Sequence, residues 1–244
     1  GFRDRGEWDE AFPYCGQGLA IAEEINIPNR IGAAHVYLAT VYAQKAAWDD
    51  AIASCNRSIE IGEKGGHPHY LVAAYAWLGL AEVMKGDLPD AREHLERSLT
   101  LAAEVGTRST VGWAHHGLAR FYLAQDDLEN AMSHCHQALE LALETGNKWR
   151  EGGAYRALGD IYSRQSSPDW IRAERFYSVS IQVLEEVQAR PSLARTHLSF
   201  GQACLRRGDY DKAREHVGKA LEMFRELDMP EKLEEAATAL RSLG

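Results

Sequence analysis

The sequence predicts an all-α fold, a right-handed solenoid of antiparallel helix pairs, and two series of small residues carry this prediction. Alanine recurs along the whole chain, at Ala11, Ala51, Ala91, Ala131, Ala173 and Ala213. A second series keeps the same step, at Ala39, Gly79, Ala119, Gly159 and Gly201. The step is 40 residues, with one interval of 42 in each series. A repeat of this length is typical of stacked supersecondary units, each of which buries its apolar face only against its neighbours.

Other columns of the repeat place large groups beside the small ones. Three positions before each alanine of the first series lies a large apolar residue: Trp8, Trp48, Leu88, Leu128, Trp170 and Tyr210. It is followed at four residues by Cys15, Cys55, Leu95, Cys135, Tyr177 and Val217. Offsets of 3, 4 and 7 lie on one stripe of a helix. Each unit is therefore predicted to hold two helices, A and B, of roughly 14 residues or ~21 Å each.

Short polar segments mark the predicted breaks between helices A and B. Gly86-Asp87, Asp126-Asp127 and Gly208-Asp209 suit a helix end in the left-handed region followed by an N-cap. The two-residue insertion predicts Ser167 as an N-cap and Pro168 as the next, first helical residue. Near the start, Pro13 is expected to kink or shorten the first B helix, predicted over residues 6–21.

These elements predict a single domain over residues 1–244. Its parts are a half repeat (1–27), five full repeats (28–66, 67–106, 107–146, 147–188 and 189–228) and a C-terminal capping helix (230–244). Five pairs exceed the three or so units that a stable stack needs. A B helix with no A helix before it predicts that the chain is a fragment of a larger protein. Its uncovered apolar face is a predicted site of self-association.

The order of these residues resembles the signature of the tetratricopeptide repeat (TPR) family, W-x-x-L-G-x-x-Y followed by A-x-x-x-F-x-x-A. The best-matched unit has Leu118, Ala119, Tyr122, Ala131, Cys135 and Ala138 at these positions. The resemblance covers nearly the whole chain, with a period of 40 rather than about 34 residues, similar to repeats of bacterial signalling and regulatory proteins. The signature's first Trp is replaced by His35, Tyr75, His115, Tyr155 and His197. We expect these three histidines to pack against helix B with one ring nitrogen hydrogen-bonded.

The resemblance implies a ligand groove lined by the A helices. Carried over to this chain, its principal positions hold Tyr37, Trp77, Trp113, His116, Arg120, Arg156, Asp160, Arg164, Arg195 and Arg206. Arginine binds carboxylates through paired hydrogen bonds, and aromatic rings offer flat contact area. The hypothesis is a peptide with apolar anchors and an acidic part. The alternative is that the arginines pair with Asp160, Glu82 or Glu151 and only solvate the surface.

The predicted function is that of a non-enzymatic protein-interaction scaffold. The alternative is a sensor or regulatory region of a bacterial signalling ATPase or transcription regulator, which binds a small effector or a neighbouring domain. A phosphate loop, a nucleophile elbow, H-E-x-x-H and C-x-x-C are all absent from the sequence. No enzyme activity and no cofactor are therefore expected.

Other classes of partner are excluded on charge and pattern. The net charge of -9 argues against nucleic acid, and no run of ~18 apolar residues could span a membrane. His134-Cys135-His136 cannot converge on a metal because i and i+2 lie on different helix faces, and His67 with His69 supplies only two ligands. The four cysteines are predicted core residues of a cytoplasmic protein. Ser58 of the sequon Asn56-Arg57-Ser58 belongs to a small buried column, so glycosylation is not expected.

Overall fold

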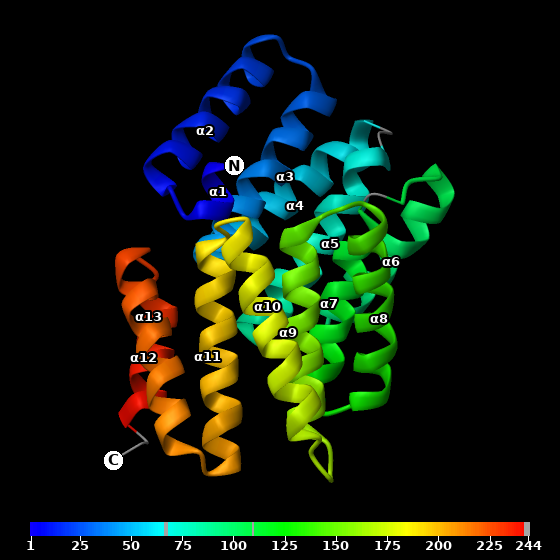
Figure 1. Cartoon of the computed structure of the whole chain (residues 1–244). Helices are drawn as coiled ribbons and strands as arrows, with labels where there is room; N and C mark the ends of the chain where they lie inside the picture. The colour runs from blue at the N-terminus through cyan, green and yellow to red at the C-terminus, as the bar shows by residue number, and fades with distance from the viewer. Residues whose placement is uncertain (66–67, 109, 242–244) are drawn as a thin grey trace. The chain divides into compact units, whose positions relative to one another are not determined.

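The computed structural model describes residues 1–65, 68–108 and 110–241. Every regular element in these ranges is a helix (Figure 1). In chain order the helices are α1 (Phe2–Arg5), α2 (Trp8–Glu24), α3 (Pro28–Lys45), α4 (Trp48–Gly65), α5 (Pro68–Lys85), α6 (Ala91–Val105), α7 (Val111–Ala124), α8 (Leu128–Glu144), α9 (Lys148–Arg164), α10 (Trp170–Glu186), α11 (Arg190–Arg207), α12 (Tyr210–Glu226) and α13 (Pro230–Arg241). The predicted all-α class is confirmed.

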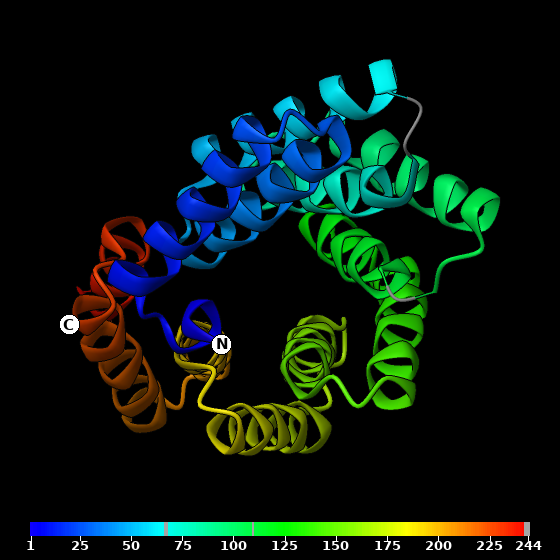
Figure 2. The same cartoon turned by 90° about the horizontal axis from the view of Figure 1, so that it is seen from above.

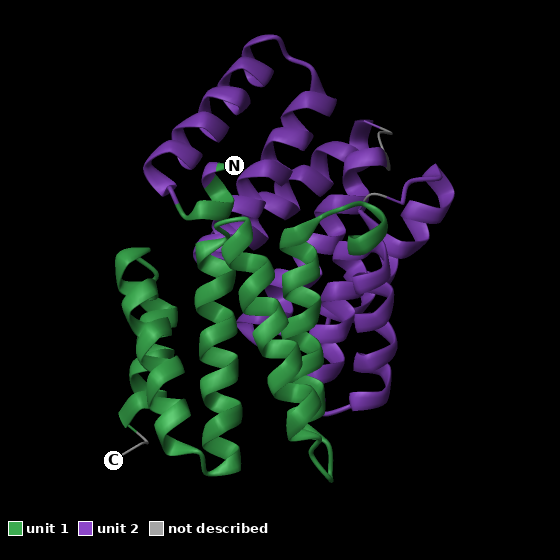
Figure 3. Ribbon diagram, in the orientation of Figure 1, with its two compact units in different colours: residues 1, 3–6, 142–244 green, residues 2, 7–141 purple. Residues whose placement is uncertain are grey.

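The chain divides into two compact units (Figure 3). Unit 1 consists of residues 1, 3–6 and 142–244, and unit 2 of residues 2 and 7–141. In unit 2, α3 packs against α4 and α5 against α6, while α5 also contacts α3 and α7. In unit 1, α9 packs against α10 and α11 against α12, while α9 also contacts α11 and α13 covers α12 (Figures 1 and 2). We call α3, α5, α7, α9 and α11 the A helices and α4, α6, α8, α10 and α12 the B helices.

The small residues lie where helices A and B meet. All six alanines of the first series are at most 4% exposed. The glycines of the second series allow a close approach: a Cβ added to Gly79 would lie 2.7 Å from the carbonyl oxygen of Ala91, on the facing helix. At Gly159 an added Cβ would lie 2.8 Å from the ring of Tyr177. The predicted register of the repeat is therefore correct in both units.

Buried serines add a hydrogen bond to three of these contacts. Ser58, Ser98 and Ser180 each occupy the same place in a B helix, seven residues after the alanine. Their hydroxyls donate to backbone carbonyls of the A helix, Gly32 at 2.9 Å, Val72 at 2.7 Å and Gly152 at 2.7 Å. Ser58 is buried, as its place in the column of small residues predicts.

Two of the predicted helix starts are confirmed and two are wrong. Asp127 and Asp209 cap α8 and α12 by accepting hydrogen bonds from Asn130 N at 3.1 Å and Lys212 N at 3.3 Å. The helix α6 starts at Ala91, with Asp90 rather than Asp87 at its N-cap. Pro89 accounts for the delay, because a proline disfavours helical dihedrals at the residue before it.

The insertion before α10 is also capped differently from the prediction. Asp169, not Ser167, is the N-cap, and its carboxylate accepts from Arg172 N at 3.0 Å. This aspartate stands directly before the large residue of its repeat, as Asp127 and Asp209 do, so the repeat register overrides the Ser-Pro signal.

Pro13 does not shorten the first B helix. The helix α2 runs without a break from Trp8 to Glu24. Pro13 deprives only the carbonyl of Asp9 of a hydrogen bond, and both residues are exposed, so water can hydrate that carbonyl.

Candidate binding surface on the A helices

The predicted groove residues of unit 2 differ widely in exposure. Tyr37 on α3 is 65% exposed, while His116 and Arg120 on α7 are partly exposed. Trp77 and Trp113 are only 3% and 8% exposed. Their ring centroids lie 4.4 Å apart, so the pair packs α5 against α7. The two tryptophans therefore shape this layer, and the surface available to a ligand is supplied by the other three residues.

In unit 1 the predicted residues line α9 and α11. Arg164 and Arg206 are exposed, Asp160 and Arg195 are partly exposed, and Arg156 is buried. The Arg206 guanidinium donates to Ser163 Oγ at 3.0 Å, which links α11 to α9. This hydrogen bond holds one exposed guanidinium in a fixed direction.

Each of the three acidic residues considered as partners for these arginines has another partner in the structure. Glu82 lies 2.8 Å from His94 Nδ1, and Glu151 lies 2.9 Å from Lys148 Nζ. Asp160 accepts a hydrogen bond from the Tyr177 hydroxyl at 2.7 Å. Burial, followed by the charge of Asp160, raises the pKa of Tyr177 well above its usual value, so this hydroxyl stays protonated and donates.

A basic group that the sequence pattern missed lies beside α9. Burial, and then the neighbouring charge of Arg3, lower the pKa of Arg150 to about 10. The Arg3 guanidinium lies 5.9 Å from the ring centroid of Trp149, whose indole N–H donates to Ser192 Oγ at 2.8 Å. The repeat has no distinctive column at Trp149, and so gave no signal for this group.

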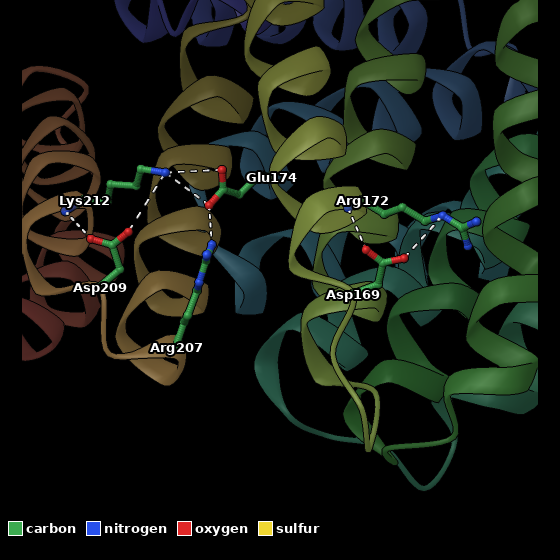
Figure 4. A network of polar contacts seen from close by, with 6 residues as sticks. All are labelled: Asp169, Arg172, Glu174, Arg207, Asp209 and Lys212. Carbon is green, nitrogen blue, oxygen red and sulfur yellow. Dashed lines mark hydrogen bonds and ion pairs between the residues drawn. The ribbon is translucent and has the colours of Figure 1, made fainter.

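Polar contacts on the B-helix side tie α10 to α11 and α12 (Figure 4). Glu174 accepts from Arg207 at 2.5 Å and from Lys212 at 3.1 and 3.2 Å. A cavity of about 350 Å³ lies here, lined by Trp170, Ile171, Glu174, Arg175, Ser178 and Arg207. In unit 2 a cavity of about 380 Å³ is lined by Glu23, Pro28, Ile31, Arg57, Glu60, Ile61, Lys64 and Gly65. Neither cavity contains a predicted groove residue.

The expectation for the histidines at the signature's first position is confirmed at two of them. His115 and His197 are buried, and their Nδ1 atoms lie 3.0 Å and 2.9 Å from Nδ1 of His134 and His216, on the facing B helix. The pattern did not predict that the partner is a second histidine. His35 is only partly buried, and burial lowers its pKa.

Metal-ligating residues do not gather in the part of the chain that the structure describes, where no three His, Cys, Asp or Glu side chains could hold an ion. The predicted His67–His69 pair lies partly outside that part. All four cysteines are free thiols, with Cys55, Cys135 and Cys204 buried and Cys15 partly exposed. Burial raises the pKa of Cys204 to about 11. Among the described helices, none combines the length and apolar character needed to cross a bilayer.

An array of A–B pairs joined by a recurring small-residue contact defines a helical repeat protein. Residues 3–161 match the MalT-like TPR region, and residues 169–226 match the tetratricopeptide repeat. The chain therefore belongs to the tetratricopeptide repeat family. Such repeats generally mediate protein–protein interactions, and their fold is generally non-catalytic.

Several solved structures share this fold at low sequence identity. BtubC from P. vanneervenii has a TM-score of 0.61 and 19% identity, over 91% of this chain and 92% of that one. A Rap protein in complex with competence and sporulation factor has a TM-score of 0.64 and 14% identity, over 91% of this chain and 66% of that one. A signal transduction ATPase with a tetratricopeptide repeat sensor, from Pyrococcus horikoshii, has a TM-score of 0.59 and 15% identity, over 85% of this chain and 31% of that one. No curated protein matches significantly in sequence.

Proposed function

We propose that this chain is a non-enzymatic protein-interaction scaffold that binds a peptide, or a segment of a partner protein, on the exposed face of its A helices. The observation that carries the proposal is the set of exposed arginines on α9 and α11, one of which, Arg206, is held in place by Ser163. A guanidinium fixed in this way loses little side-chain freedom when it binds a carboxylate. The peptide therefore carries acidic residues opposite unit 1.

Unit 2, taken by itself, offers an aromatic contact on its A helices. Tyr37 presents most of its ring, and a tyrosine ring contributes large contact area with few rotatable bonds. An apolar or aromatic side chain of a partner segment is proposed to contact Tyr37. The partner is proposed to be a protein, and neither a nucleic acid nor a membrane, since the net charge of -9 disfavours an extended polyanion, whereas a short acidic segment meets only the local arginines. The buried reduced thiols fit a cytoplasmic location.

Peptides selected from a random displayed library supply the probe for this proposal. Their affinity is measured by fluorescence polarisation for the wild type and for Arg164→Glu with Arg206→Glu. We expect acidic peptides, and at least a tenfold loss of affinity in the variant, because two attractive charges become repulsive. The matched control is Arg175→Glu with Arg214→Glu on the B helices, which should bind as the wild type does. Equal affinity in all three proteins would refute the proposal.

A second candidate is a sensor region that binds a small effector or a neighbouring domain. It is supported by the likeness to the ATPase with a repeat sensor and to the Rap protein bound to its factor, of which this chain spans 31% and 66%. Calorimetry with the selected peptides separates the candidates. A peptide of about ten residues that binds no more tightly than a fragment of two or three residues favours the effector-sized site.

The partner is also proposed to include a second copy of the chain, through α2. Tyr14 and Ile21 on this helix, and Ile25 directly after it, are exposed apolar side chains of the kind that mark interaction surfaces. Light scattering should show a dimer at high concentration that Ile21→Ser with Ile25→Ser abolishes. A wild type that stays monomeric would contradict this part of the proposal.

A further inference from the structure

Two repeats join helix A to helix B through a pair of histidines with the same geometry. In α7–α8 the Nδ1 atoms of His115 and His134 lie 3.0 Å apart, with ring centroids at 5.2 Å and an interplanar angle of 27°. In α11–α12 the values for His197 and His216 are 2.9 Å, 5.1 Å and 26°. The partners are 19 residues apart in both pairs. The arrangement is therefore a property of one repeat position, used twice.

In another repeat the same position holds a pair of aromatic residues that do not titrate near neutral pH. In α9–α10 it holds Tyr155 and Phe176, whose rings lie 6.1 Å apart at 18°. Phe176 also stacks on Tyr162 at 5.5 Å, as His134 stacks on Tyr122 at 5.5 Å. The Tyr–Phe pair thus occupies the space that the His–His pair occupies in α7–α8.

The histidine pairs occur where the buried serine is missing. The B-helix column that supplies Ser58, Ser98 and Ser180 holds Ala138 in α8 and Ala220 in α12. An alanine methyl group donates no hydrogen bond, so these two repeats lack that link to the A-helix carbonyl. The histidine pair provides a polar link between helices A and B in its place.

This link requires that at least one of the two imidazole rings is neutral. A hydrogen bond between two Nδ1 atoms needs one N–H donor and one lone pair, so at most one ring of a pair can be charged while the bond persists. Two imidazolium rings would place two N–H groups, and two positive charges, about 3 Å apart in a partly buried contact. We propose that the two histidine pairs are acid-labile clasps, which make α7–α8 and α11–α12 the first helix pairs to separate in mild acid.

The surrounding charges do not compensate a protonated pair. Burial lowers the pKa of His134, and the carboxylate of Glu96, on α6, opposes this shift, but Arg92 already binds this carboxylate at 2.7 Å. Arg92 also acts directly on His134, with a repulsive sign. The nearby carboxylates are thus occupied by cations before any imidazolium forms.

The environment of the second pair is similar. The pKa of His216 is affected by the charges of Glu215, Lys212 and Lys219 on α12 and of Glu174 on α10. The charges of Lys219 and Glu215 also affect the pKa of His197. Lys219 binds Glu215 at 2.7 Å, and Lys212 and Arg207 bind Glu174. Two carboxylates and two lysines leave no net negative charge beside this pair.

The direction in which pH changes the stability follows from the pKa of the buried histidine of each pair. Burial, and then the partner histidine, lower the pKa of His115 and of His197 to about 4. The unfolded value is about 6.5. Between these values the unfolded chain takes up protons that the folded chain excludes, so the folded-to-unfolded ratio falls about tenfold per pH unit for each such histidine. The clasp is fully effective above pH ~6.5 and weakens as the pH falls towards 4.

Three buried cysteines of the chain can report whether these helix pairs separate. Cys135 on α8 and Cys204 on α11 are buried in the repeats with clasps, and Cys55 is buried on α4, which has none. The whole chain is labelled with 4,4'-dipyridyl disulfide, which reacts with thiols in acid, at pH 7.5 and pH 5.0. Each rate is normalised to the denatured chain at the same pH. We expect protection of Cys135 and Cys204 to fall at least tenfold at pH 5.0, and that of Cys55 to change less.

The matched variant is His115→Tyr with His134→Phe, which installs the pair found in α9–α10. It should abolish the acid labelling of Cys135 and leave that of Cys204 intact. The reverse change, Tyr155→His with Phe176→His, should make the thermal midpoint more sensitive to acid, and it remains a test if the first variant does not fold. Uniform loss of protection at all three cysteines, or loss at Cys135 that persists in the first variant, would overturn the proposal.

Discussion

Replacing Gly79 by alanine should destabilise the protein, although alanine is the better helix former. An exposed helical glycine changed to alanine gains about 1 kcal/mol. At Gly79 the added methyl group would lie 2.7 Å from the Ala91 carbonyl oxygen and 2.6 Å from Leu95 Cγ. The first of these is a backbone atom that cannot rotate away. Overpacking costs ~1–3 kcal/mol, and the rigid backbone partner places Gly79 in the upper part of that range. After the gain of about 1 kcal/mol from helix propensity, we expect a net loss of about 1–2 kcal/mol.

The repeats themselves show how the clash is avoided. The column of Gly79 holds alanine at Ala39 and Ala119, and in both of those repeats the residue in the Leu95 column is a cysteine. Where the column holds glycine, the partner is larger, as in Gly159 with Tyr177. Leu95→Cys alone removes buried side-chain volume and should cost about 2 kcal/mol. Combined with Gly79→Ala, the loss should be smaller than the sum by about 1–2 kcal/mol, because the pair then matches two natural repeats.

Urea unfolding followed by helical circular dichroism measures this cycle. The control is Gly218→Ala in α12, where an added Cβ meets no atom within 4 Å and the midpoint should rise. The reasoning is refuted if Gly79→Ala is as stable as the wild type, or if the two substitutions are strictly additive.

Three further predictions concern single contacts. The hydrogen bond to the Glu82 carboxylate raises the pKa of His94, although burial acts in the opposite direction. The contribution of this ion pair to the free energy of unfolding is therefore present at low pH and is lost as the pH rises through that raised pKa. His94→Phe should cost about 1–2 kcal/mol near pH 5 and less near pH 8 in urea melts. Asp209→Ala should cost about 1 kcal/mol by removing the cap of α12, whereas Asp90→Ala, which makes no side-chain cap bond in α6, should leave the thermal midpoint nearly unchanged. Ser98→Ala should cost about 1 kcal/mol because it leaves the Val72 carbonyl without its hydroxyl donor, and an equal effect from Ser133→Ala, at an exposed position, would contradict that assignment.

The fold could be predicted from the sequence because each packing position recurs five or six times along the chain. One buried alanine such as Ala131 is uninformative, but six at one spacing specify the stripe, the partner helix and the register together. Local signals were weaker where they stood alone. The prediction that Pro13 would shorten α2 and that Ser167 would cap α10 each rested on one residue, and in both places the repeat register determined the helix bounds.

The binding surface was less predictable because its exposure depends on contacts between A helices. The column pattern defines which face of each A helix turns away from helix B, but it contains no information on how α5 meets α7. That contact buries Trp77 and Trp113 against each other. The aromatic content of the face, read from the sequence, therefore overstates what a ligand can contact there.

The same reasoning separates the two functions of a polar residue in a repeat. Ser98 and His115 recur at fixed positions and bind across the A–B contact, so their periodicity follows from packing. Tyr37 and Arg164 are exposed, and their columns hold unrelated residue types in other repeats, such as Gly117 and Met84, so packing does not require them. In this solenoid the periodic polar residues therefore indicate how the units hold together, whereas exposed residues such as Tyr37 are the ones proposed to contact a partner. The charge reversal at Arg164 and Arg206 tests the second group, and the histidine exchange at His115 and His134 tests the first.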